Sequence, residues 1–229
     1  MPLHPNYRDD SLVAAQTASL IARGERIFQV FRFSDDDGEH CRQLLELFDP
    51  PRGAHVLDIG CGIGEFALHM QRPDLWWLLN NCSQAQLDLC PRGMSYVKAD
   101  MCDLAVVRSG SMDAAMMLYS LGNATDPGAA LREAARVLRP GGVLFIWDMA
   151  HEAGRDSHEL PELGYTLYSP LMLATHMYGQ FDFIDGGMLD LPPTSATRFA
   201  RILDEDLGPG SFVRIMQGVR PVAYRFVKR

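Results

Sequence analysis

The sequence predicts an α/β fold: one seven-stranded, mostly parallel β-sheet with helices on both faces and an antiparallel last strand. Two observations lead to this expectation. Strand-like apolar runs alternate with helical patterns between residues 54 and 148, and two β-rich runs near the end of the chain flank a short turn. The length of 229 residues, with 47% hydrophobic and 22% charged side chains, suits one such domain with an added lid.

The first 148 residues carry the pattern in order. A helix is expected over residues 10–30, within an N-terminal helical cap of residues 1–38, and a second over Glu39–Phe48, whose apolar side chains form one stripe. The last helix of this part is the best marked, because Asp126 is a good N-cap and Pro127 suits a first helical turn. Strands are expected at Ala54–Ile59, Leu75–Asn80, Met94–Lys98, Ser111–Tyr119 and Val143–Asp148, and helices between them at Glu65–Gln71, Gln84–Leu89 and Pro127–Leu138.

The alternation ends after Asp148. Residues 149–194 are rich in Gly, Pro, Tyr, Met and His, with one helix expected near Pro170–Tyr178, and their length and apolar composition predict a lid insertion over one face of the sheet. A helix is expected at Ala196–Leu207, and the runs Phe212–Gln217 and Val222–Val227 are expected to form a hairpin. Residues 195–229 would in this way complete the sheet.

A glycine-rich turn is the sharpest signal in the sequence. In Val56–Glu65 (VLDIGCGIGE), a buried strand runs directly into glycines at 60, 62 and 64 and then into a helix. Glycines let the backbone approach a ligand closely and take positive φ, and a helix N-terminus offers free N–H groups. A dinucleotide site would have its third glycine where Glu65 stands. Asp58, just before the turn, would repel a pyrophosphate and attract a cationic amino group.

This motif resembles the first motif of class I S-adenosylmethionine-dependent methyltransferases, which have a Rossmann-like fold. Over residues 39–148 three further landmarks agree. Asn81 stands where the family usually has Asp or Glu on the ribose hydroxyls, and Asp100 stands where an acidic residue of the family lies against the adenine. Arg136–Phe145 is similar to the family's signature between the last helix and the fifth strand. Asn81 departs from the family pattern, since an amide lacks the charge assistance of a carboxylate. The resemblance implies S-adenosylmethionine as cofactor and residues 39–148 as its binding core. The cofactor contacts that it implies come from Asp58, Gly60, Cys61, Gly62, Gly64, Asn81, Cys82, Asp100, Met101 and Tyr119.

Methyl transfer requires alignment of the acceptor with the methyl group and, where the acceptor carries a proton, its removal. Ligands of open α/β sheets lie beyond the carboxyl ends of the strands, which is where Tyr119 and His151 are expected. His151 is the preferred candidate base, His176 is the next, and Tyr119 is a further catalytic candidate. The apolar residues of 149–194 favour a small, apolar metabolite methylated on O, N or C. A protein methyltransferase, and a binding or scaffold protein without transfer activity, are the alternatives.

Composition limits the expected partners. The net charge of −8, from 21 basic and 29 acidic side chains, argues against a nucleic-acid surface. The five cysteines contain no CxxC pair, which argues against a zinc site or a disulfide framework, and no metal is expected. The sequence shows neither a signal peptide nor a run of 18 apolar residues, so a cytoplasmic protein with no membrane partner is expected. We expect a monomer or homodimer that binds a small-molecule acceptor.

Overall fold

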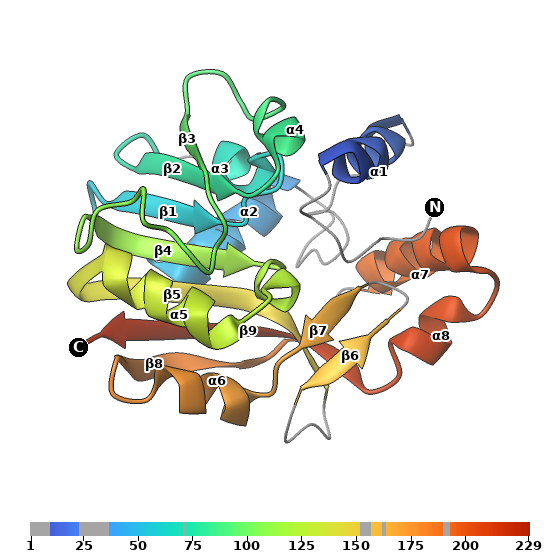
Figure 1. Ribbon diagram of the computed structural model, residues 1–229. Coiled ribbons are helices and arrows are strands. Elements are labelled where there is room, and N and C mark those ends of the chain that lie inside the picture. The colour runs from blue at the N-terminus through green and yellow to red at the C-terminus, as the bar shows by residue number, and fades with distance from the viewer. Residues whose placement is uncertain (1–9, 23–36, 71, 152–156, 162–163, 190–192) are drawn as a thin grey trace.

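The computed structural model describes residues 10–22, 37–70, 72–151, 157–161, 164–189 and 193–229. Its main sheet has seven strands in the order β3-β2-β1-β4-β5-β9-β8 (Figure 1). The pairs β3-β2, β2-β1, β1-β4 and β4-β5 are parallel, whereas β9 is antiparallel to both of its neighbours. The expected fold class is therefore confirmed. The strands of this sheet are β1 His55–Ile59, β2 Trp76–Asn81, β3 Ser95–Lys98, β4 Met112–Leu118, β5 Leu138–His151, β8 Phe181–Met188 and β9 Val219–Lys228.

Helices cover both faces of the sheet. Their bounds are α1 Asp10–Ala22, α2 Asp37–Phe48, α3 Glu65–His69, α4 Gln84–Leu87, α5 Pro127–Val137, α6 Pro170–Met177, α7 Pro193–Leu207 and α8 Ser211–Ile215. A 3-10 turn, η2 (Leu121–Asn123), follows β4, and a separate two-stranded sheet is formed by β6 (His158–Leu160) and β7 (Tyr165–Leu167). The start of α5 is as expected, because the Asp126 side chain accepts a hydrogen bond from Ala129 N and Pro127 opens the helix.

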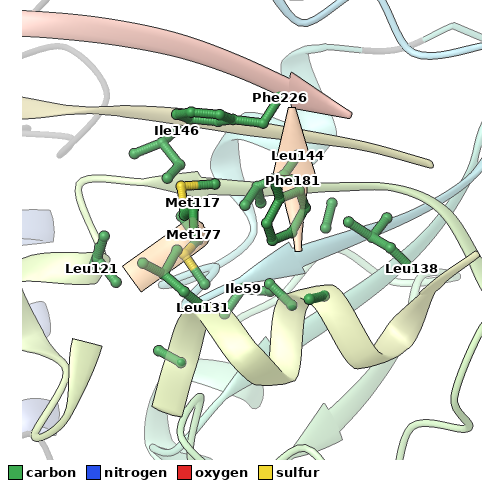
Figure 2. Packing of buried hydrophobic residues seen from close by; sticks show 14 of the residues in the cluster. Ile59, Met117, Leu121, Leu131, Leu138, Leu144, Ile146, Met177, Phe181 and Phe226 are labelled. Carbon is green, nitrogen blue, oxygen red and sulfur yellow. The ribbon is translucent and has the colours of Figure 1, made fainter. Parts of the chain in front are cut away.

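Alternation along the strands divides the core into two layers. On β1, Val56 belongs to the cluster that contains apolar residues of α2, α3 and α8, while Leu57 and Ile59 belong to the cluster that contains those of α5 and α6. Figure 2 shows the second cluster, in which Met117 and Ile146 of the sheet pack near Leu131 of α5 and Met177 of α6. A strand buried on both faces is mainly apolar, which is why the sequence predicts β1, β4 and β5 despite one aspartate in each.

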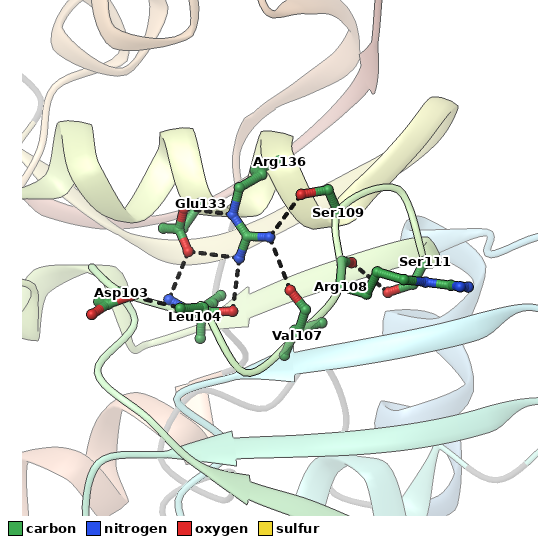
Figure 3. A network of polar contacts seen from close by, with 9 residues as sticks. Asp103, Leu104, Val107, Arg108, Ser109, Ser111, Glu133 and Arg136 are labelled. Atoms are coloured by element: carbon green, nitrogen blue, oxygen red, sulfur yellow. Dashed lines mark hydrogen bonds and ion pairs between the residues drawn. The ribbon is translucent and has the colours of Figure 1, made fainter.

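The connection between β3 and β4 is held by one arginine of α5. Arg136 donates to the carbonyl oxygens of Leu104 (2.7 Å) and Val107 (2.9 Å), and it pairs with Glu133, which accepts from Leu104 N at 2.6 Å (Figure 3). These bonds tie a long irregular segment to a rigid helix. They also limit how far the residues just after β3 can move relative to the sheet.

Two expectations for the second half of the chain are wrong. The apolar content of Phe212–Gln217 predicts a strand, but Ser211–Ile215 is helix α8, because Phe212, Ile215 and Met216 share a helical spacing and pack into the core together. Instead of a hairpin partner, β9 pairs antiparallel with β8, which precedes α7 and lies inside the segment expected to be a lid. Residues 149–194 are therefore not one lid: β8 is a sheet strand and α6 packs against α5.

The remaining elements lie along the edge of the sheet that the carboxyl ends of the parallel strands form. Figure 1 shows α1, α7 and the β6–β7 hairpin on the side to which the arrows of β1 and β4 point. The expected N-terminal helix is present as Asp10–Ala22, and residues 23–30 of that expectation lie outside the described residues, as do 152–156, 162–163 and 190–192 of the expected lid. Within the described parts of the chain, none of the helices has both the length and the apolar content needed to cross a lipid bilayer.

Candidate functional site

The turn after β1 has the conformation that only glycine adopts without strain. Gly60, Gly62 and Gly64 have φ of 75°, 58° and 75°. The N–H groups of Gly60 and Cys61 both donate to the carbonyl of Asn80 on β2, at 3.0 and 2.9 Å. The start of the turn is thus fastened to the end of the neighbouring strand.

The three glycines have different steric surroundings. A Cβ at Gly60 would lie 2.5 Å from Ser120 Cβ and 3.3 Å from Met101 Cε, so the ends of β1, β3 and β4 meet at this glycine. A Cβ at Gly64 would lie 2.9 Å from atoms of Leu79 and Pro91 in the protein interior. A Cβ at Gly62 would meet no atom of the described residues within 4 Å. Among the described residues, none closes off the Gly62 side of the turn, so a ligand could approach the backbone there.

Asp58 is a buried carboxylate with an unused oxygen. The residue is 1% exposed, and Oδ2 finds no hydrogen-bond partner among the described residues. Burial raises the pKa of this carboxyl to about 8. An orphaned buried acceptor is costly unless a ligand completes it, and a cationic amino group would do so. The residue thus fits the role expected of it.

Asn81 is 5% exposed, and its amide is committed within the protein. Nδ2 donates to the Gly62 carbonyl (3.0 Å) and to Gln86 Oε1 (2.8 Å), and Oδ1 accepts from Ser83 N (3.0 Å). Both amide hydrogens are therefore used, and only one acceptor position on Oδ1 is left for a ribose hydroxyl. Cys82, also expected at the cofactor, follows directly and is half-buried.

Two further expected cofactor residues lie on the loop after β3. Asp100 is half-buried and accepts a hydrogen bond from Cys102 N at 2.9 Å, which fixes its carboxylate in the loop. The side chain of Met101 lies close to Gly60, because its Cε would be 3.3 Å from a Cβ at that glycine. Cys61, within the turn, is buried, and burial together with the Cys90 thiol raises its pKa, so that it stays a neutral thiol.

A group of aromatic and acidic side chains lies at the carboxyl ends of β4 and β5. Tyr119 has φ of 47°, unusual for a residue with a side chain, and its ring centroid is 4.6 Å from that of Trp147. Asp148 is 7% exposed and accepts from the Tyr165 hydroxyl at 2.6 Å and from Met149 N at 2.8 Å. Burial raises the pKa of Asp148 to about 7 against these hydrogen bonds. Tyr165 belongs to β7, so the hairpin is joined to the sheet here.

The two candidate histidines lie on different elements. His151 is the last residue of β5, at the carboxyl end of the strand as expected and three residues beyond Asp148; it pairs with Val219, and its ring centroid is 4.9 Å from that of His158. His176 lies against Gly128 in the first turn of α5, on the sheet face covered by that helix. The structure thus brings Asp58, the glycine turn, Asn81, Met101 and Tyr119 to the carboxyl ends of the strands. His151 lies at the carboxyl end of β5, whereas His176 lies against α5.

Sequence reasoning missed several residues of this edge. Ser120 packs against Gly60, and its hydroxyl donates to the Ile59 carbonyl at 2.7 Å. Its position directly after β4 could have indicated it. Tyr165 and Gln86 contact site residues that are 17 and 5 positions away along the chain, and no local pattern marks either of them.

Residues 57–146 match the family model described as "Methyltransferase domain". These residues form a class I S-adenosylmethionine-dependent methyltransferase domain. The matched residues run from β1 to β5 and so contain the glycine turn, Asn81 and Tyr119.

The relatives and solved structures that this domain resembles are named for different reactions. Over 155 residues it is 39% identical to the mouse (Mus musculus) tRNA (carboxymethyluridine(34)-5-O)-methyltransferase ALKBH8, covering 62% of this chain and 23% of that protein. Over 108 residues it is 32% identical to a ubiquinone biosynthesis O-methyltransferase from Xanthomonas oryzae pv. oryzae, covering 41% and 42%. The chain therefore spans less than half the length of these curated relatives. The crystal structure of the [4+2]-cyclase SpnF shares the fold, with a TM-score of 0.78 at 18% identity over 100% of this chain and 98% of that one.

Proposed function

We propose that this protein transfers the methyl group of S-adenosylmethionine to an O, N or C atom of a small, apolar acceptor, as a monomer or homodimer without nucleic-acid or membrane partners. One observation carries the proposal. A glycine turn that is open at Gly62 lies beside a buried carboxylate, Asp58, that lacks a partner among the described residues, and the tyrosine-lined ends of β4 and β5 lie along the same edge. A cofactor and an acceptor would meet along that edge.

The residues of the chain would divide the binding of the cofactor between them. Asp58 would pair with the amino group of the methionine portion, and Gly60 and Gly62 would let that portion approach the backbone. The remaining acceptor position of Asn81 Oδ1 would take a ribose hydroxyl, and Met101 would pack near the turn. When bound, the cofactor supplies a methyl group activated by a positively charged sulfur.

Asp148 is better placed than His151 to take a proton from the acceptor. It lies at the carboxyl end of β5 close enough to Tyr119 that its charge, after burial, helps raise the pKa of that tyrosine. Its own pKa of about 7 suits a general base near neutral pH. The Tyr165 hydroxyl holds the carboxylate in place, while Tyr119 stays a neutral phenol that can donate a hydrogen bond to the acceptor.

Two other functions have support from particular relatives. The likeness to a tRNA methyltransferase favours an RNA acceptor. The net charge of −8 argues against it, because RNA-binding proteins usually present a basic surface to the phosphates. The other alternative, a binding or scaffold protein without transfer activity, is compatible with this fold, since a protein named as a [4+2]-cyclase shares it. Both alternatives keep the same cofactor edge, so cofactor binding alone does not separate them.

The test is turnover. S-adenosylhomocysteine should form when the protein is given S-adenosylmethionine with small phenols, amines and carboxylic acids, and it should not form with total tRNA. Calorimetry with S-adenosylhomocysteine comes first, and failure to bind would refute the proposed cofactor. Binding without product from any acceptor would favour the non-transfer alternative, and product from tRNA alone would favour the RNA alternative.

A further inference from the structure

The N-terminal helix is joined to the glycine turn by a chain of hydrogen bonds. Gln86 Nε2 on α4 donates to Thr17 Oγ1 on α1 at 3.2 Å. Gln86 Oε1 accepts from Asn81 Nδ2 at 2.8 Å, and the same Asn81 nitrogen donates to the Gly62 carbonyl at 3.0 Å. Three consecutive bonds therefore connect a helix at one end of the chain to the middle of the cofactor turn.

The three side chains of this relay are deeply buried. Asn81, Gln86 and Thr17 are 5%, 6% and 7% exposed, so water does not readily replace a bond that is lost. The direction of each bond is fixed as well. The Gly62 carbonyl can only accept and Ser83 N can only donate, which sets the orientation of the Asn81 amide and, through it, the orientation of the Gln86 amide.

A second set of contacts docks α1 without passing through the relay. Asp10 Oδ1 accepts from Gln84 N at 3.1 Å, at the start of α4, and Asp10 Oδ2 pairs with Lys98 Nζ at 3.1 Å. These contacts hold the helix to α4 and β3, whereas Thr17 reaches Gln86. Asp10 also bonds the Ser83 side chain, so a change at Asp10 disturbs the docking without removing any of the three side chains of the relay.

We propose that Gln86 and Thr17 are positioning residues for the cofactor turn, because they hold the Asn81 amide against the Gly62 carbonyl and so couple the docking of α1 to cofactor binding. The inference rests on the proposed cofactor and goes beyond it. In the methyltransferases that the motif resembles, the residue at position 81 is usually a carboxylate that grips the ribose directly. Here the same position acts first as a clamp on the turn. Coupling is reciprocal, so the bound cofactor should also hold α1 more firmly.

This arrangement predicts that the family-like residue is harmful at position 81. In Asn81→Asp, Gln86 could turn its amide and Thr17 could donate its hydroxyl, so that side of the relay survives. The Gly62 carbonyl has no such freedom and would face a carboxylate oxygen. Asn81→Asp should therefore weaken S-adenosylhomocysteine binding about tenfold, the size of one unsatisfied buried polar group. A carboxylate acting only on the ribose would tighten binding instead.

The experiment compares four variants with the wild-type chain by calorimetry with S-adenosylhomocysteine and by amide hydrogen exchange. Thr17→Val keeps the shape of the side chain and removes the hydroxyl, while Thr17→Ser restores the hydroxyl and should rescue both measurements. Thr17→Val should speed exchange in the peptide that contains residues 60–64 and weaken binding about fivefold. Asp10→Asn, which removes the charge that pairs with Lys98, should speed exchange in α1 with less effect on that peptide.

The exchange measurement needs no ligand, so it tests the relay even if the proposed cofactor is wrong. Unchanged exchange at residues 60–64 in Thr17→Val would overturn the inference, as would tighter binding by Asn81→Asp. Absence of S-adenosylhomocysteine binding by the wild-type chain would count against the proposed function alone. In the wild-type chain, the ligand should slow exchange in Asp10–Ala22, and Thr17→Val should remove most of that protection.

Discussion

The buried carboxylate of Asp58 should make the stability of the cofactor-free protein fall as the pH rises. Its pKa is about 8 in the folded protein and roughly 3.9 in an unfolded chain. Between these values the folded state holds a proton that the unfolded state releases, so the free energy of unfolding falls with increasing pH. The slope from this one group is at most about 1.4 kcal/mol per pH unit, or roughly 3 kcal/mol between pH 5 and 7.

Asp58→Asn removes that slope while keeping the size of the side chain. The free energy of unfolding of the variant, relative to wild type, should therefore rise between pH 5 and 7, and its melting temperature should gain roughly 5–10 °C relative to wild type over the same range. Any fixed cost of burying the amide is the same at every pH and cancels from this difference. Thermal unfolding of the two proteins in matched buffers is the assay, with the exposed Glu46→Gln as a control for net charge.

The cofactor gives the same experiment a second arm. An amino group that pairs with Asp58 favours the ionised carboxylate, so saturating S-adenosylhomocysteine should flatten the pH dependence of the wild-type protein and should bind Asp58→Asn more weakly. A difference between Asp58→Asn and wild type that does not change with pH would refute the claim that burial raises the pKa of Asp58. A flat difference is also what a solvent-exposed carboxylate would give.

Other substitutions probe the turn and the acceptor side. Gly60→Ala should abolish S-adenosylhomocysteine binding, because the new Cβ would lie 2.5 Å from Ser120 Cβ; calorimetry should show partial recovery in Gly60→Ala with Ser120→Gly. In Gly62→Ala the new Cβ meets no atom of the described residues and should cost only the strain of positive φ, about 1 kcal/mol. Equal losses at both glycines would therefore contradict this steric account. Tyr165→Phe should raise the pKa of Asp148 further, because the hydrogen bond that it removes stabilises the carboxylate. The increase of kcat with pH should then occur at a higher pH than in wild type. An unshifted pH profile of kcat would exclude Asp148 as the base.

The elements that the sequence predicts correctly are those whose signals are local. The strand, turn and helix around the glycines depend on residues that are neighbours in the chain, and so does the start of α5 at Asp126 and Pro127. The strands β1, β4 and β5 are buried on both faces, which leaves mainly apolar runs in the sequence, each interrupted by an aspartate: Asp58, Asp113 and Asp148. The position of the cofactor turn can therefore be inferred from the amino-acid sequence alone.

The elements that the sequence does not predict depend on contacts between distant segments. Phe212–Gln217 has the apolar content of a strand, and only its packing into the core through Phe212, Ile215 and Met216 makes part of it a helix. β8 is an edge strand whose place in the sheet depends on its pairing with β9, about 40 residues later in the chain. Because the two paired strands are so far apart in the chain, no local sequence pattern predicts that β8 is the outer strand of the sheet.

The residues around the turn show the same division. The sequence by itself determined that the glycines at 60, 62 and 64 form a turn directly after the buried strand that holds Asp58, because strand burial and positive φ constrain residue type at these positions. Only the tertiary structure decided that the Asn81 amide donates to the Gly62 carbonyl and to Gln86. It also decided that Gln86 donates to Thr17, which lies 69 positions earlier in the chain. A hydrogen bond between buried side chains requires a geometry that arises only when the whole chain has folded.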